Sequence, residues 1–130
     1  MTGTRYFTDD AGWQQEAGYS RAVRRGSVIM VSGTTAHGPD GGALHRGDTG
    51  AQARLCLRRI EAALAALGGS LQDVVRTGIY LAPGASWDQA ALAHRDAFAD
   101  IRPACTMLYV AELIGDGFLV EIEAQAVVAS

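Results

Sequence analysis

The sequence predicts a small α+β protein in which two helices cover one face of a single sheet. Two segments carry apolar residues at every third or fourth position, which is the period of a helix. Short β-branched runs lie between them, and a long strand with alternating apolar residues follows. The 130 residues fit one domain, which we expect to span positions 1–130.

The predicted elements are, in chain order, hairpin strands at 22–24 and 28–32, a helix at 49–67, a strand at 74–81, a helix at 87–99, and strands at 106–111 and 119–128. Arg25–Gly26–Ser27 is typical of a hairpin turn between the first two strands. Asp48 or Thr49 can cap the first helix, and Gly68–Gly69 can end it through a left-handed residue.

Proline and glycine divide the second half of the chain. The run 74–81 is short and rich in β-branched residues, which favours a strand. Ser86 can cap the second helix, and Pro103 prevents that helix from continuing. Gly115 and Gly117 supply the turn before the last strand.

The last strand predicts which side of the sheet meets the helices. Because side chains alternate along a strand, the unbroken apolar row from Val120 to Val128 should face the helices. By the same parity, the opposite face should carry Leu119, Glu121, Glu123, Gln125 and Val127, together with Met30, Ser32, Cys105, Met107 and Tyr109. Such a face is too apolar for water, and we expect it to meet other copies of the chain.

Charge and composition exclude several classes of protein. A net charge of −3, with 48% hydrophobic and 19% charged residues, indicates a globular domain and argues against a nucleic-acid partner. The short basic cluster of Arg21, Arg24 and Arg25 is expected to be solvated. No apolar run is long enough to span a membrane and no apolar leader is visible, so we expect a cytoplasmic protein. The spacing of Cys and His does not suit zinc, and we expect no metal or other cofactor.

Several segments resemble one known family. Residues 101–106 are Ile-Arg-Pro-Ala-Cys-Thr, and residues 117–124 are Gly-Phe-Leu-Val-Glu-Ile-Glu-Ala. This pair of motifs resembles the RidA/YjgF signature, in which Pro-Ala-Arg-Ser/Thr is followed by an acidic strand. Residues 18–22 and 31–33 are similar to the family's N-terminal Tyr-Ser and Ser-Gly motifs, so the resemblance covers nearly the whole chain.

The resemblance implies a chorismate-mutase-like fold with one mixed sheet, which assembles as a homotrimer. The three sheets of such a trimer form a central barrel, and clefts between subunits bind small molecules. The better-known members hydrolyse reactive enamines and imines that amino-acid dehydratases form. Their cleft holds the substrate carboxylate with an arginine, and it also uses a tyrosine, a serine and a glutamate that positions water.

Motif alignment carries three of these four residue types over to this chain. Tyr19 and Ser32 become substrate-binding candidates, and Glu121 becomes the catalytic candidate. The arginine position is Cys105, and Met107 shares its predicted face, so both are further candidates for substrate binding. A thiol cannot hold a carboxylate in two places, and losing two charge-assisted hydrogen bonds would weaken carboxylate binding roughly a hundredfold or more.

The cysteine leaves several functions open. The first hypothesis is a hydrolase that deaminates an imine, an enamine or a related metabolite other than the usual carboxylate-clamped 2-aminoacrylate, with Glu121 positioning water. The second is a trimer that binds a metabolite without turnover. A minor alternative makes Cys105 a catalytic nucleophile, although a nearby Glu121 would disfavour its thiolate. RNA cleavage, for which some family members are named, is disfavoured by the acidic charge.

The other notable side chains have structural interpretations. His37 and His45 flank a glycine-rich turn and are interpreted as surface residues. His94 lies on an apolar helical stripe and is interpreted as a core histidine with a satisfied hydrogen bond. Trp87 is interpreted as core packing, and Cys56 as a small helix residue.

Overall fold

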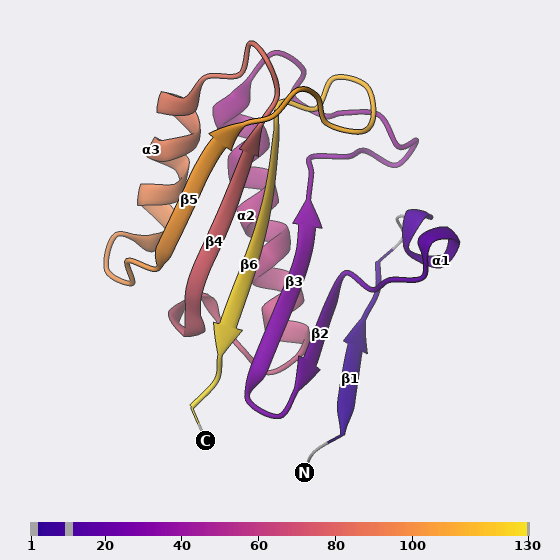
Figure 1. Ribbon diagram of the computed structural model, residues 1–130, viewed down its shortest axis with the longest axis vertical. Helices are drawn as coiled ribbons and strands as arrows, with labels where there is room; N and C mark the ends of the chain where they lie inside the picture. The colour runs from indigo at the N-terminus through magenta and orange to yellow at the C-terminus, as the bar shows by residue number, and fades with distance from the viewer. Residues whose placement is uncertain (1–2, 10–11, 130) are drawn as a thin grey trace.

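The computed structural model describes residues 3–9 and 12–129, and its centre is a six-stranded sheet in the order β1-β2-β3-β6-β4-β5 (Figure 1). The strands are β1 (Thr4–Phe7), β2 (Ala22–Arg25), β3 (Val28–Thr34), β4 (Val74–Leu81), β5 (Ala104–Tyr109) and β6 (Val120–Val127). Every neighbouring pair is antiparallel except β4 and β5, which run parallel. The predicted mixed sheet is therefore confirmed.

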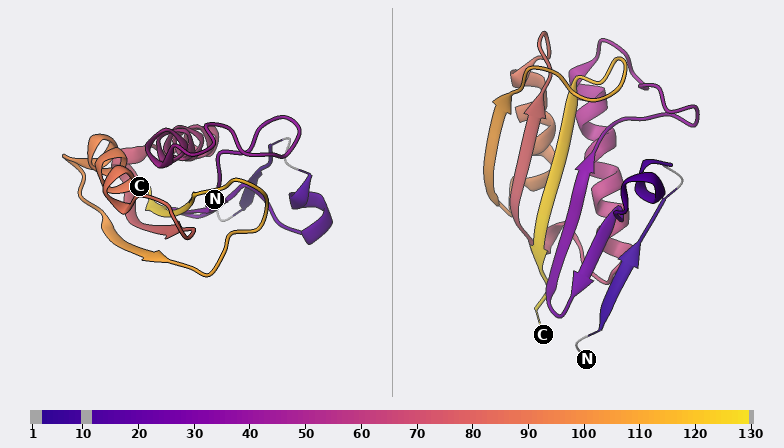
Figure 2. Two further views of the ribbon diagram at one scale, coloured as in Figure 1. Left: turned by 90° about the horizontal axis from the view of Figure 1, so that it is seen from above. Right: turned by 45° about the vertical axis from the view of Figure 1, so that its right-hand side comes forward.

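Both long helices lie on one face of this sheet, as Figure 2 shows from above. They are α2 (Thr49–Ala66) and α3 (Trp87–Phe98). The Asp48 carboxylate accepts a backbone N–H from the first turn of α2 at 3.0 Å, and the Ser86 hydroxyl does the same for α3 at 3.3 Å. Gly68 follows α2 with φ at 83°, the left-handed conformation that glycine adopts without strain. The predicted helical layer and its caps are confirmed.

The core lies between these helices and alternate residues of the central strands. Val120, Ile122, Ala124 and Ala126 of β6 are at most 2% exposed, which confirms the predicted apolar row. The neighbouring strand β4 contributes its own alternate row, which ends at the fully buried Leu81. Because one row of each strand is buried, the opposite row is fixed on the other side of the sheet.

The opposite side of the sheet, called here the open face, carries acids among apolar side chains. Glu121 and Glu123 of β6 lie there, half-buried. Met30 and Val127 are 46% and 47% exposed, on neighbouring strands of the same face. The predicted mixture of acidic and apolar residues is thus confirmed for β3 and β6.

The face predicted for β5 is wrong. Its ladder with β4 pairs Cys105 with Thr77 and Met107 with Ile79, and both β4 residues are buried on the helix side. Cys105, Met107 and also Tyr109 therefore lie on the helix side of the sheet rather than on the face that carries Glu121. On this edge strand both alternating rows are partly apolar, so the hydrophobic pattern alone does not select a face.

The N-terminal elements were not predicted. Strand β1 has 4 residues and pairs only with β2, and α1 (Trp13–Ala17) has 5 residues. A further short 3-10 turn, η1 (Leu71–Asp73), leads into β4. Elements this short cannot display the spacing by which longer helices and strands are identified.

One core assignment on a helix is also wrong. Trp87 is 56% exposed, because the buried stripe of α3 begins only at Ala90. Cys56 is buried within α2 and His94 is half-buried, as expected. Among residues 3–9 and 12–129, no helix combines the length and the apolar character that crossing a membrane requires.

Candidate functional site

Two cavities meet at Glu121. The first, of about 330 Å³, is lined by Trp13, Tyr19, Arg21, His37, Phe118 and Glu121, among others. The second, of about 390 Å³, is lined by Tyr80, Glu112, Glu123 and the loop before β6. Gly33, Ile114 and Glu121 border both cavities. The first is called here the Tyr19–Glu121 cavity.

A bulge in β3 makes room for the Glu121 carboxylate. The ladder between β3 and β6 shifts its register between Val31 and Thr34, and Gly33 lies within this interval. A Cβ atom on Gly33 would collide with Oε2 of Glu121, so the carboxylate occupies the space that a side chain would fill. Glycine at this point of the strand therefore holds the acid against the backbone.

The environment of Glu121 alters its acidity. Partial burial raises the pKa of its carboxyl group above the usual value, Arg21 opposes this rise, and the charge of Glu123 adds to it. A raised pKa brings a carboxyl group closer to the pH at which it both accepts and releases protons. Glu121 is thus suited to general acid–base chemistry.

Arg21 is a buried cation of the cavity wall. It is 5% exposed, so the expectation that it is solvated is wrong. Its Nη1 donates to the Gly33 carbonyl and, at 3.2 Å, to Thr34 Oγ1. Its Nε lies 3.4 Å from Oδ2 of Asp9. Arg21 thus ties the β3 bulge to the N-terminal segment.

The structure brings two of the predicted site residues into one cavity and places a third beside it. Tyr19, which is 39% exposed, lines the same cavity as Glu121. Ser32 immediately precedes Gly33, but its hydroxyl donates to the Ser20 carbonyl at 2.8 Å. Ser32 therefore fastens the strand that leads to the bulge.

Cys105 and Met107 do not join Glu121 within one chain. Cys105 is exposed on the edge strand, and Met107 packs against the hydrophobic core on the helix side. The ladder partner of Cys105, Thr77, is paired with His94 on that side, with its Oγ1 atom 2.8 Å from Nε2 of His94. The expected satisfied hydrogen bond of His94 is confirmed.

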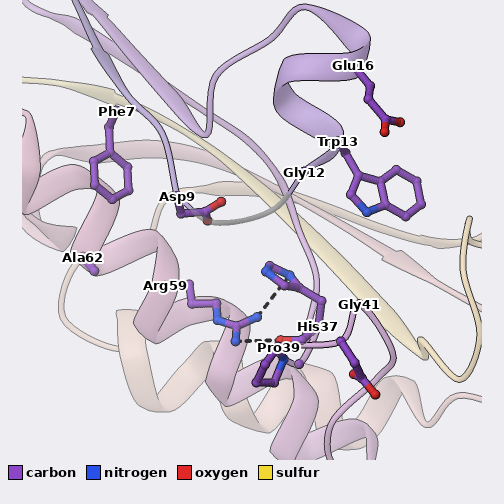
Figure 3. Close-up of a pocket in the computed structure, with 12 residues that line it drawn as sticks. Phe7, Asp9, Gly12, Trp13, Glu16, His37, Pro39, Gly41, Arg59 and Ala62 are labelled. Atoms are coloured by element: carbon purple, nitrogen blue, oxygen red, sulfur yellow. Dashed lines mark hydrogen bonds between the residues drawn. The ribbon is translucent and has the colours of Figure 1, made fainter.

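His37 was interpreted as a surface residue, and the structure places it differently. It lines the Tyr19–Glu121 cavity and also a larger cavity of about 770 Å³, drawn in Figure 3. Arg59 of α2 lies against it, with Nη1 at 3.2 Å from Nδ1 of His37 and Nη2 donating to the His37 carbonyl at 2.8 Å. Burial and the Arg59 charge lower the pKa of His37.

The residues missed at the cavity lie in segments without periodicity. Trp13 belongs to the short α1, His37 lies in the glycine-rich loop, and Arg21 belongs to what reads as a basic surface cluster. Nothing in the sequence indicates that His37, in a polar loop, and Arg59, on a helix, lie in contact in the folded protein. In the part of the chain that the structure describes, no three His, Cys, Asp or Glu residues form a cluster that could hold a metal ion.

The family model described as endoribonuclease L-PSP matches residues 11–128, and the chain belongs to this family, which is the YjgF/RidA family. The family predicted from the motifs is therefore confirmed.

Individual relatives agree with this assignment. The 3-aminoacrylate deaminase RutC of Acinetobacter baylyi is 31% identical over 110 residues, which are 85% of this chain and 86% of the relative. An uncharacterized protein of Streptomyces coelicolor is 33% identical over 115 residues, covering 88% and 84%. The crystal structure of a YjgF/YER057c/UK114 family member from Mycobacterium tuberculosis superimposes with a TM-score of 0.87 and 42% identity, over 97% of this chain and 100% of that one.

Proposed function

We propose that this chain is a hydrolase that deaminates a small imine or enamine, with Glu121 as the general acid–base. The half-buried Glu121 carboxyl group, which shares a cavity with Tyr19, carries this proposal. The similarity to an enzyme named 3-aminoacrylate deaminase supports the reaction class. The cavity of about 330 Å³ suits a small metabolite.

The chemistry requires water and two proton transfers. An enamine first tautomerises to its imine, and Glu121 then accepts a proton from the water that attacks the imine carbon. The new carbon–oxygen bond forms as the carbon–nitrogen double bond becomes single, and the nitrogen takes up the proton. Glu121 then passes the hydroxyl proton to the amine nitrogen, the carbon–oxygen bond becomes double and the carbon–nitrogen bond breaks, so that imine and water give a carbonyl compound and ammonia. Tyr19 supplies ring surface and a hydroxyl to the bound molecule.

The substrate we propose is not the usual carboxylate-clamped 2-aminoacrylate. The cysteine at position 105 cannot form the two parallel hydrogen bonds with which a guanidinium holds a carboxylate. The acids that border the two cavities, Glu121, Glu123 and Glu112, also repel an anion. Both features favour a substrate without a carboxylate near the reacting carbon.

We further propose that the chain works as a homotrimer with a cleft between subunits, in the cytoplasm. The exposed apolar side chains of the open face, including Met30 and Val127, support association. In such a cleft, Cys105 and Met107 on the edge strand of one subunit are available to complete the cavity of another. Both cysteines are free thiols, which suits the reducing cytoplasm.

The experiment that tests the hydrolase is ammonia release from a panel of imines generated in place by an amine oxidase or a dehydratase. Glu121→Gln should lower the rate about a hundredfold or more, because general acid–base catalysis contributes that much. Glu61→Gln, at an exposed acid of α2 that borders neither cavity at Glu121, should leave the rate unchanged. A panel without any rate above buffer would contradict the proposal.

The second candidate is a trimer that binds a metabolite without turnover, and Cys105 is the observation that favours it. A ligand recovered unchanged by mass spectrometry, with unaltered binding in Glu121→Gln, would select this candidate. A Cys-dependent hydrolase has less support, since His94, on the side of the sheet that carries Cys105, is engaged with Thr77.

RNA cleavage, the activity in the family's description, is less favoured for this chain. The net charge is −3, and the cavities around Glu121 are bordered by carboxylates. RNA binding draws most of its affinity from cations against phosphates, and the carboxylates around Glu121 oppose such contacts.

A further inference from the structure

His37 occupies a position from which it can touch a molecule bound beside Glu121. It lines the Tyr19–Glu121 cavity and the larger cavity of Figure 3, and Trp13 and Gly41 also border both. The glycine-rich loop that carries His37 is closed on itself by an isolated bridge between His37 and Ala43. The imidazole is therefore part of the wall between the two cavities.

Arg59 fixes which ring nitrogen of His37 carries the proton. Nη1 of Arg59 lies 3.2 Å from Nδ1 of His37, and a guanidinium has only hydrogens to offer, so Nδ1 must accept. The neutral imidazole then carries its proton on Nε2. The guanidinium is itself held in place, because Nη1 also donates to the Thr35 carbonyl at 2.9 Å and Nη2 to the His37 carbonyl at 2.8 Å. Figure 3 shows this fork of Arg59 against the His37 ring and backbone.

Among the described residues, none is found hydrogen-bonded to the proton on Nε2, and the Thr35 carbonyl, which also faces the imidazole, accepts Nη1 of Arg59. No described residue forms a hydrogen bond with Nε2 of His37, and the only buried side-chain nitrogen or oxygen without a hydrogen bond in the described chain is Nε of Arg21. Nε2 therefore remains accessible. A donor that a fold orients and leaves accessible in a cavity wall is available to a ligand.

The charges around the ring decide what this donor can bind. Arg59 of α2 and Arg21, which precedes β2, face the imidazole, and so does Asp9, which follows β1. Nη1 and Nη2 of Arg59 donate to Thr35 and His37, and Arg21 is ion-paired with Asp9. The imidazole donor is uncharged, and Glu121 stands in the same cavity, so this donor attracts a carboxylate little and Glu121 repels one.

We infer that His37 is a ligand-binding residue of the Tyr19–Glu121 cavity, which donates Nε2–H to an uncharged acceptor oxygen such as that of an amide or a ketone. Arg59 is the positioning residue that holds His37 in this tautomer. The inference rests on the site of the proposed function and adds to it the substrate class, a small molecule with a neutral carbonyl oxygen. His37 would thus supply a hydrogen-bond donor to the ligand in a protein that has Cys105 at the position of the family's arginine.

The tautomer can be measured directly by long-range ¹H–¹⁵N spectra of the protein with labelled histidine. The spectrum of His37 should show the proton on Nε2. Arg59→Lys, which keeps a donor against Nδ1, should retain this pattern, and Arg59→Met should give a mixture of tautomers. A purely structural arginine would leave the tautomer unchanged in both variants, and a proton on Nδ1 in the unaltered protein would overturn the inference.

Ligand preference is tested with propionamide and propionate, which differ in charge and hardly in shape. Propionamide should shift the His37 signal on titration, and His37→Phe should weaken its binding about threefold to tenfold, the contribution of one neutral hydrogen bond. His37→Gln, which keeps a donor near the place of Nε2, should bind more tightly than His37→Phe. His45→Gln, at an exposed histidine of the same loop, is the matched control and should bind as the unaltered protein does.

The outcomes separate this inference from the proposed hydrolase. Tighter binding of propionate than of propionamide, or equal binding by His37→Phe, would overturn the role of His37. Binding as expected without ammonia release from any imine would leave this role intact and would contradict only the hydrolase. Ammonia release with no effect of His37→Phe on binding or rate would support the hydrolase and would contradict only the role of His37.

Discussion

At the scale of single residues, Glu121 is the proposed general acid–base, and its ionised form also costs the fold stability. The carboxylate sits against Gly33 on a half-buried strand, where ionisation costs more than it does in water. Functional sites often contain a residue whose local environment destabilises the fold, as burial does for the ionised Glu121. This cost of ionisation can be detected by measuring stability as a function of pH.

Replacing Glu121 by Gln should raise the free energy of unfolding at neutral pH. The pKa of Glu121 is raised in the folded state above its ordinary value of 4.5, so the folded state binds more protons between the two pKa values. Stability of the unaltered protein therefore falls as the pH rises through this interval, whereas Gln cannot ionise. Urea unfolding should show the variant to be more stable at about pH 7 and no more stable at about pH 4. An equal difference in unfolding free energy between Glu121→Gln and the unaltered protein at both pH values would show that burial does not perturb the pKa of Glu121.

At the residue scale, the sequence predicted only part of the candidate site. Tyr19 and Glu121 were identified from motifs and do share a cavity. Arg21 and His37 were not, because their roles depend on which carbonyls and side chains lie opposite them after folding. In the sequence, Arg21 cannot be distinguished from surface arginines. In the structure, the β3 bulge places the Gly33 carbonyl where Arg21 donates to it.

At the scale of elements, the predictable ones were those with one buried and one open side. Strand β4 was predicted with its observed bounds, Val74–Leu81, and the two faces of β6 were assigned correctly. Strand β5 failed because an edge strand buries neither row fully, so its parity carries no information about the face. Strand β1 is shorter still. Periodicity predicts an element only where burial has imposed the period.

Helix α2 has a further function that its apolar stripe does not reveal. Its Gln52 is fully buried, and it donates to the Gly117 carbonyl at 3.0 Å while accepting the Leu119 N–H at 2.9 Å. It also donates to the Leu44 carbonyl at 3.1 Å. One amide side chain thus joins the glycine-rich loop to the start of β6.

Gln52→Leu should therefore destabilise the protein by at least about 2 kcal/mol, because a buried backbone group left without a partner costs about 1–3 kcal/mol. Chemical unfolding measures this loss. Gln89→Leu is the matched control, since the exposed Gln89 of α3 only accepts the Gly50 N–H, and its effect should stay within about 0.5 kcal/mol. Equal losses in both variants would show that Gln52 does not hold the loop and β6 together.

At the scale of the whole molecule, the sheet is covered on one side only. The helices occupy one face (Figure 2). The open face presents apolar side chains among acids. The sequence predicted this asymmetry through the alternation of β6, and the fold confirms it. The partner on the open face could not be derived from the same alternation, since a pattern shows that a face is apolar and not what covers it.

Association through the open face predicts a selective effect of charge. Val127→Glu, on the open face, should convert the proposed homotrimer to smaller species, because a carboxylate buried at an interface without a partner costs several kcal/mol. Leu92→Glu on the outer side of α3 is a close match, with 43% of the residue exposed against 47% for Val127, and should leave the assembly unchanged. Sedimentation velocity measures both. A monomer in the unaltered protein would refute the proposed trimer.

The contact between Gly33 and Glu121 has a consequence for how this protein can change over evolutionary time. The acid fills the volume that any larger residue at position 33 would need, so position 33 can change only together with a shorter residue at 121. Position 121, in contrast, can accept an isosteric or shorter residue alone. A lineage that loses the acid is therefore free to replace the glycine afterwards, and recovery of the acid then requires both positions to change back.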